Sequence, residues 1–174
     1  SLRYDDRGWG DKSTDFSRFT TDDFKQDAAA ALQLLRQRFH FTRVGIVGHS
    51  EDGTIALMLA AEGKADFIVS LAGMAASGRE TLLQQNRLVL QAAGMTPDVV
   101  ETYCKPIAKA LDALAAGKAI EEISDADVPA EMKPVFKKTL QQGNSPYMRH
   151  FLTLNPAALL PKIKCPVLAL NGTK

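Results

Sequence analysis

The residues best suited to chemistry in this 174-residue sequence are Ser50 and the glycines on either side of it, Gly48 and Gly53. A short apolar run rich in β-branched residues, 44–47, precedes them and predicts a buried strand of a parallel sheet. From Thr54 onward the pattern becomes helical. A strand, a sharp glycine turn and a helix in this order expose a serine hydroxyl and direct backbone N–H groups and a helix N-terminus at the same point. This arrangement favours nucleophilic attack by the serine.

Residues 48–53 read Gly-His-Ser-Glu-Asp-Gly and resemble the nucleophile elbow of the α/β-hydrolase superfamily, especially of its esterases and serine aminopeptidases. Elbows of that group often read Gly-His-Ser-Glu-Gly-Gly, so Asp52 departs from the pattern. The resemblance implies that Ser50 is the catalytic nucleophile and that the backbone N–H of Glu51 is one donor of the oxyanion hole. Asp52 adds bulk and negative charge where the superfamily has a glycine that lets helix and strand approach closely. Without the resemblance, the alternative is a strand–turn–helix unit of another α/β protein with an incidental serine.

A second stretch, residues 4–13, supports the same superfamily. It resembles the loop after the superfamily's fourth strand, often written Tyr-Asp-x-Arg-Gly-x-Gly-x-Ser, with one additional residue between Gly10 and Ser13. Taken alone, its glycines and aspartates predict a turn-rich loop that leaves a strand ending at Tyr4. A phosphate-binding loop is the alternative, but neither G-x-x-x-x-G-K-[ST] nor a complete G-x-G-x-x-G occurs here.

Helices and strands alternate around the elbow, which predicts a parallel sheet with right-handed crossovers. Thr20 and Asp23 have the spacing of a capping box, and the helix that they begin carries an apolar stripe as far as Phe39. Further strands are expected over 67–72 and 167–170. The predicted class is α/β, with a mostly parallel sheet and flanking helices. The resemblance makes this an α/β-hydrolase fold that is incomplete at both ends and carries a helical cap insert.

A long helical region separates the last two predicted strands. We expect residues 1–74 to form part of the hydrolase core with the nucleophile elbow, 75–154 to form a helical cap or lid insert, and 155–174 to return to the core with the last strand. In the superfamily a lid is commonly inserted here and covers the serine; the alternative is a plain helical layer packed on the sheet. Pro106 is expected to kink or divide a helix of the insert.

The sequence provides no partner for the serine. In the superfamily the acid follows the strand that matches 167–171, and the histidine comes later still, so the resemblance places both beyond Lys174. The 174 residues alone are therefore expected to be inactive. His49 is expected to be structural, His40 to be solvated or to cap a helix, and His150 to belong to the helical insert.

Composition excludes several other classes of protein. Lys and Arg number 21 and Asp and Glu 20, so the net charge of +1 offers no electrostatic basis for binding nucleic acid. Two cysteines are too few for a disulfide framework or a zinc-ligand cluster, and no apolar run approaches the ~20 residues of a membrane span. We expect no metal and no cofactor.

The sequence favours a serine hydrolase that cleaves carboxylic esters, or related acyl bonds, of a small-molecule substrate. Esters are preferred to peptides by analogy with the commonest use of the fold. Two alternatives remain: a serine aminopeptidase, and a non-catalytic protein of the α/β-hydrolase fold that binds a ligand or partner under its helical cap.

Overall fold

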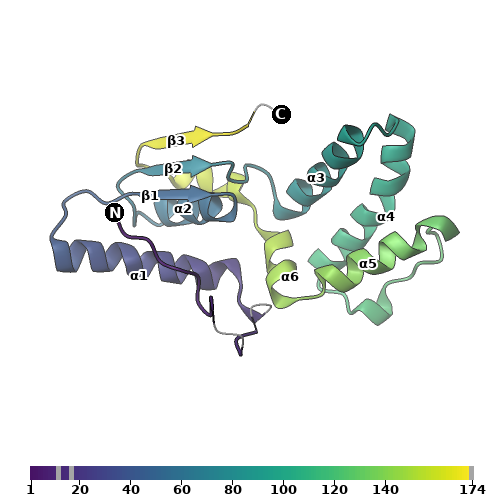
Figure 1. Ribbon diagram of the computed structural model, residues 1–174, viewed down its shortest axis with the longest axis horizontal. Coiled ribbons are helices and arrows are strands. Elements are labelled where there is room, and N and C mark those ends of the chain that lie inside the picture. Colours follow the sequence, from purple (N-terminus) through teal and green to yellow (C-terminus); the bar gives the residue numbers. More distant parts are fainter. Residues whose placement is uncertain (11–12, 16–17, 173–174) are drawn as a thin grey trace. The chain divides into compact units, whose positions relative to one another are not determined.

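The computed structural model describes residues 1–10, 13–15 and 18–172, and it divides the chain into two compact units (Figure 1). The first unit comprises Ser1–Ala76 and Asn155–Lys174, and the second comprises Ser77–Leu154. Each unit has hydrophobic clusters of its own. The candidate nucleophile belongs to the first unit.

The first unit is built on a parallel three-stranded sheet with the strand order β1-β2-β3. The strands are β1 (Ile46–His49), β2 (Ile68–Leu71) and β3 (Val167–Leu170). Ile46 pairs with Ile68, and Ile68 pairs with Val167, so the three strands end level with one another. The sheet and its flanking helices confirm the predicted α/β class.

The first strand begins two residues later than expected, because Val44 is bonded to a loop residue. The Val44 N–H donates to Asp66 Oδ2 at 2.7 Å, and the Val44 carbonyl accepts from the Asp66 N–H at 2.9 Å. These bonds use the backbone groups of Val44 before the ladder with β2 starts at Ile46.

Two helices flank this sheet, α1 (Thr21–Phe39) and α2 (Glu51–Ala61). The predicted capping box begins α1: the Thr20 N–H donates to Asp23 Oδ2 at 2.8 Å. Leu32 of α1 shares a hydrophobic cluster with Ile55 and Leu59 of α2. The other side of α2 packs on the sheet through a second cluster: Ala56, Leu57, Ala60, Ala65 and Ile68. A 3-10 helix, η4 (Pro156–Lys162), leads into β3.

The sequence predicts buried strands, but β1 and β2 are buried mainly on one face and β3 is exposed. Along β2, Ile68 and Ser70 are buried, but Val69 between them is half-buried. Val47 pairs with Val69 and is 67% exposed. Paired residues share a face and successive residues alternate, so Val47 and Val69 lie on the face opposite Ile68. The edge strand β3 is exposed along its whole length, including Val167, which pairs with Ile68.

Residues 1–6 form no strand, although the sequence predicts a strand ending at Tyr4. A groove of about 340 Å³ has this segment, α1 and β1 along its walls, and Tyr4, Asp6 and Asp52 are among its lining residues. The groove separates residues 1–6 from β1, so the two segments do not form the ladder of backbone hydrogen bonds that defines a strand.

The second unit is helical in all of its regular elements, as predicted. Its α-helices are α3 (Gly78–Ala92), α4 (Pro97–Ala115), α5 (Lys133–Gly143) and α6 (Pro146–Thr153), with 3-10 turns η2 (Ile120–Glu122) and η3 (Ala130–Met132). Phe136, Leu114 and Leu152 are almost fully buried in its core. The Gly78 N–H donates to the Leu154 carbonyl at 3.0 Å, so the two ends of this unit lie side by side.

Pro106 does not divide α4, which is one continuous helix from Pro97 to Ala115. Of the two outcomes expected for Pro106, division of the helix is therefore wrong, and a kink stays a prediction. Buried residues lie on both sides of the proline, including Val100 and Leu114, and both belong to the core of the second unit. Burial along the whole helix outweighs the ~3 kcal/mol that an internal proline costs.

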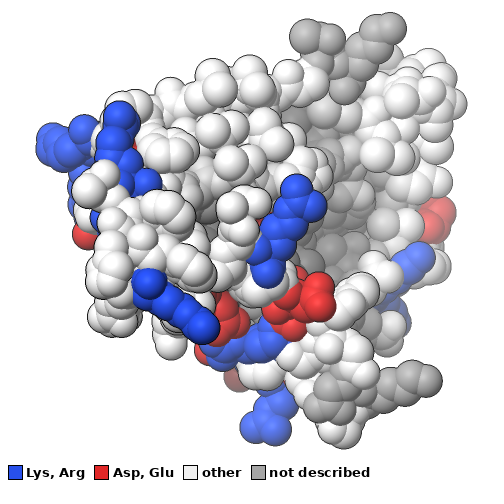
Figure 2. Space-filling model, turned by 60° about the vertical axis from the view of Figure 1, so that its left-hand side comes forward, with Lys and Arg blue, Asp and Glu red and all other residues white. Residues whose placement is uncertain are grey.

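The surface carries charges of both signs. On the face in Figure 2, Lys and Arg side chains are interspersed with those of Asp and Glu, in keeping with the near-neutral composition. Over the residues described, none of the helices has the length and apolar character needed to cross a membrane.

Candidate active site

Ser50 joins β1 to α2 in a strained backbone conformation, with φ 56° and ψ −117°. These torsions lie outside the regions that non-glycine residues adopt without strain. The Ser50 N–H donates to the Leu71 carbonyl of β2 at 2.8 Å, and the Ser50 carbonyl accepts from the Thr54 N–H at 3.4 Å. The strained turn is thus held between the neighbouring strand and the first turn of α2, with Ser50 exposed at the C-terminal edge of the sheet.

The two glycines of the motif both lie where a side chain would not fit. A Cβ atom on Gly48 would overlap the backbone carbonyl of Asp52 and would lie 2.6 Å from the backbone nitrogen of Gly53. A Cβ atom on Gly53 would lie 2.8 Å from Ser70 Oγ and 2.9 Å from Gly73 Cα. The close approach between α2 and the end of β2 therefore occurs at Gly53.

Asp52 lies outside this close approach, so its side chain does not crowd the contact between helix and strand. It lines the groove beside residues 1–6 instead. Asp52 is exposed to solvent, but partial burial of its carboxylate raises its pKa above the usual value, and the charges of Asp6 and Glu51 raise this pKa further. The charge of Asp52, rather than its bulk, is what the site must accommodate.

Glu51 contributes both a backbone donor and an anchored side chain. It is the first residue of α2, where a backbone N–H has no acceptor within the helix. Its Oε1 atom accepts a hydrogen bond of 2.6 Å from Thr21 Oγ1. Thr21 is the first residue of α1 and is 0% exposed. Sequence reasoning identified the cap at Thr20 and missed the role of its neighbour.

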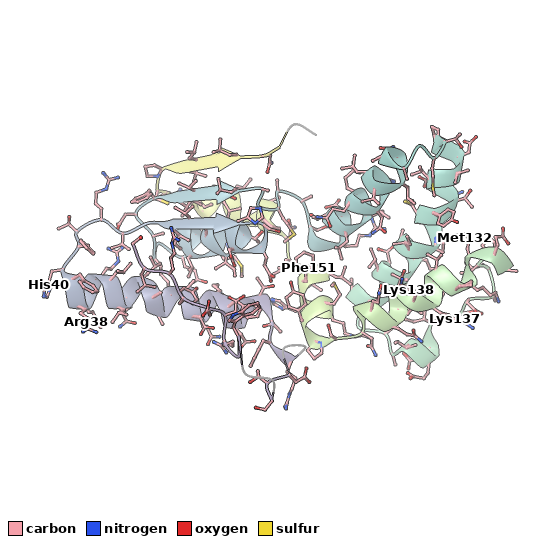
Figure 3. All side chains as sticks on the ribbon, in the orientation of Figure 1. Arg38, His40, Met132, Lys137, Lys138 and Phe151 are labelled. Carbon is pink, nitrogen blue, oxygen red and sulfur yellow. The ribbon has the colours of Figure 1, made fainter. Side chains whose placement is uncertain are left out.

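No histidine is hydrogen-bonded to the Ser50 hydroxyl in the described part of the chain. His49 is exposed at the end of β1, directly before Ser50. His40 ends α1 with φ 54° and donates its N–H to the Arg36 carbonyl at 3.1 Å. Figure 3 shows His40 with Arg38 at the C-terminal end of α1, the end far from the C-terminal edge of the sheet. His150 lies on α6 in the second unit.

The site has no evident place for a metal ion: among the residues described, no three His, Cys, Asp or Glu side chains are grouped to hold one. What the arrangement offers is a serine hydroxyl, the N-terminus of α2 beside it and tight glycine packing behind it. These features suit nucleophilic attack on a carbonyl with stabilisation of the resulting oxyanion.

A comparison with protein families gives one match for the chain. The model of the X-Pro dipeptidyl-peptidase (S15) family matches residues 2–174, a range that includes the turn at Ser50, residues 4–13 and the helical unit. The comparison with curated proteins found no match.

Proposed function

Because the chain belongs to the X-Pro dipeptidyl-peptidase (S15) family, a family of serine peptidases with the α/β-hydrolase fold, we propose that Ser50 is the nucleophile of an acyl-transfer reaction. The observation that carries the proposal is the strained backbone of Ser50 between β1 and α2. Such strain persists only where the surrounding structure enforces it, and it clusters at active sites. In this conformation the turn is a nucleophile elbow.

The reaction proceeds in two steps. Ser50 Oγ attacks the substrate carbonyl while a histidine takes its proton, and the Glu51 N–H donates a hydrogen bond to the oxyanion that forms. The intermediate collapses to an acyl-enzyme as the histidine returns the proton to the leaving group, and water then releases the acyl group. The superfamily resemblance implies this histidine and a carboxylate that orients it.

We propose esters as the first substrate class. An ester leaving group departs with less help from a general acid than an amine does, so ester cleavage makes the smaller demand on this site. The family match favours a second candidate, removal of dipeptides that end in proline from the N-terminus of a peptide. Turnover of p-nitrophenyl acetate and of Ala-Pro-p-nitroanilide by the intact protein distinguishes the two substrate classes.

We also propose that the second unit is a cap that shapes the substrate pocket. Its position in the chain supports this, since residues 77–154 are inserted between β2 and β3 and have a hydrophobic core of their own. An insertion at this point leaves the sheet and the elbow uninterrupted.

A fluorophosphonate probe tests the central proposal, because it phosphonylates activated serines by the same attack. The intact protein should be labelled, and peptide mapping should place the adduct on Ser50. An adduct on another serine, or no adduct with a folded protein, would favour the non-catalytic alternative.

Removing the charge of Asp52 is expected to raise kcat. A negative charge near the oxyanion site opposes the charge that develops there, and one such interaction of about 1 kcal/mol changes the rate roughly fivefold. Because the side chain does not crowd the helix contact, Asp52→Asn and Asp52→Gly should raise kcat equally, with little change in KM. Asp98→Asn is a matched control, since Asp98 is also the second residue of its helix. A gain with glycine alone would instead identify bulk as the obstacle.

Asp52→Asn should also change how stability depends on pH. The pKa of Asp52 is raised in the folded protein, so the folded state binds this proton more tightly than the unfolded state does. The stabilisation that protonation of Asp52 gives to the folded state is fully present at low pH. It is lost as the pH rises through the folded-state pKa of Asp52. We expect Asp52→Asn to raise the melting temperature at pH 7, with the gain disappearing below about pH 4. An equal gain at both pH values would show that the carboxylate charge is not its cause.

A further inference from the structure

We infer that Thr21 is a positioning residue for the oxyanion hole, acting through the side chain of Glu51. The inference rests on the proposed function of Ser50 and the Glu51 N–H. It starts from one contact: Thr21 Oγ1 donates a hydrogen bond of 2.6 Å to Glu51 Oε1, across 30 positions of sequence.

Thr21 is held firmly enough to serve as an anchor. It is completely buried and is the first residue of α1, between the two capping-box residues Thr20 and Asp23. The N-terminal loop secures the same helix end, because Arg7 Nε donates to Asp27 Oδ2 at 2.6 Å and Arg7 Nη2 donates to the Asp23 carbonyl at 3.0 Å. The helix end that carries Thr21 is therefore held by its own cap and by the loop before it.

Glu51 links the Thr21 hydroxyl to the proposed oxyanion hole, because its side chain accepts the Thr21 bond and its backbone N–H is the proposed donor. Its backbone N–H belongs to the peptide that joins it to Ser50, and its side chain extends from the same Cα atom. When Thr21 holds that side chain, the torsional freedom of the Glu51 backbone is reduced. The N–H donor then stays directed at one point, as oxyanion stabilisation requires.

The opposite side of the turn has a separate support. The Ser50 N–H is bonded to the Leu71 carbonyl in β2, which fixes the peptide before Ser50. Thr21 supports the peptide after it. Loss of the Thr21 bond should consequently leave Ser50 and the substrate pocket in place while loosening the oxyanion donor, so the effect should fall on kcat rather than on KM.

The test uses Thr21→Val, which keeps the shape of the side chain and removes the hydroxyl, in the intact protein. Hydrolysis of p-nitrophenyl acetate should show kcat reduced roughly tenfold with KM nearly unchanged. Thr21→Ser retains the hydroxyl and should restore kcat. Thr139→Val is a control for the loss of one threonine hydrogen bond, since Thr139 Oγ1 donates to the Val135 carbonyl within α5 at 2.9 Å.

Glu51→Ala provides an independent route to the same answer. If Thr21 acts through Glu51, the double variant Thr21→Val/Glu51→Ala should be no slower than Glu51→Ala alone. The inference would be overturned if the kcat loss of the double variant equalled the product of the two single losses. An unchanged kcat in folded Thr21→Val would also overturn it. Ser50→Ala distinguishes failure of the proposed function from failure of the role of Thr21. Unaltered hydrolysis in Ser50→Ala overturns the proposed function. If Ser50→Ala loses hydrolysis but Thr21→Val keeps its kcat, only the role of Thr21 is overturned.

Discussion

Replacing Ser50 with alanine should lower kcat for ester hydrolysis about 10⁶-fold, since loss of the nucleophile in serine hydrolases removes nearly all of the chemical rate enhancement. Fluorophosphonate labelling should disappear together with turnover. The fold should persist, because the backbone bonds of Ser50 to Leu71 and Thr54 do not involve its hydroxyl. Initial rates with p-nitrophenyl acetate, measured beside a circular dichroism melt, check both parts of this expectation.

An exposed serine outside the turn between β1 and α2 is the matched control for this experiment. Ser124 accepts a hydrogen bond from the Ala126 N–H in a turn of the second unit, and Ser124→Ala should leave turnover and labelling intact. Comparable activity in Ser50→Ala and Ser124→Ala would move the chemistry to another residue.

Replacing Gly48 with alanine is expected to produce the largest loss of stability among the substitutions considered. The new methyl group would overlap the carbonyl of Asp52, and neither atom belongs to a flexible side chain that could turn aside. Forcing backbone apart inside a packed turn costs about 3 kcal/mol. The shift would also move the start of α2, so hydrolysis should be lost with stability. Urea melts of the two proteins measure the change.

Gly94→Ala separates this crowding from the general effect of losing a glycine. Gly94 has φ 79° with nothing within 4 Å of an added Cβ, so its substitution carries only the strain of a left-handed backbone, about 1–2 kcal/mol. We expect Gly48→Ala to be the more destabilising of the two and to be the only one that affects activity. Equal losses would mean that the turn adjusts to the methyl group.

The local features of the site could be predicted from the sequence, because they depend on residues close together in the chain. The alternation of strand and helix predicted the parallel sheet, and Thr20 with Asp23 predicted the start of α1. The position of Ser50 at the end of a strand followed from the glycines beside it. Its role in catalysis stays a prediction, as do the oxyanion donor at Glu51 and the lid.

Contacts between distant residues could not be predicted in the same way. Nothing in a single sequence links Thr21 to Glu51, or shows that Gly53 rather than position 52 meets Gly73 beside β2. The continuity of α4 through Pro106 also depends on tertiary burial, which no local pattern contains. The helix-breaking preference of proline predicted a division at Pro106, but tertiary packing keeps α4 continuous.

The hydrogen bond between Gly78 and Leu154 has a consequence for how this architecture can diversify. The second unit leaves and rejoins the rest of the chain at neighbouring points, and its hydrophobic core is its own. Domains whose two ends lie close together can be inserted, lengthened or exchanged with little strain on the rest of the protein, because the distance between the two attachment points stays short. The helical unit is in this respect a replaceable module, and its sequence can change while the strand-and-helix frame around Ser50 stays constant.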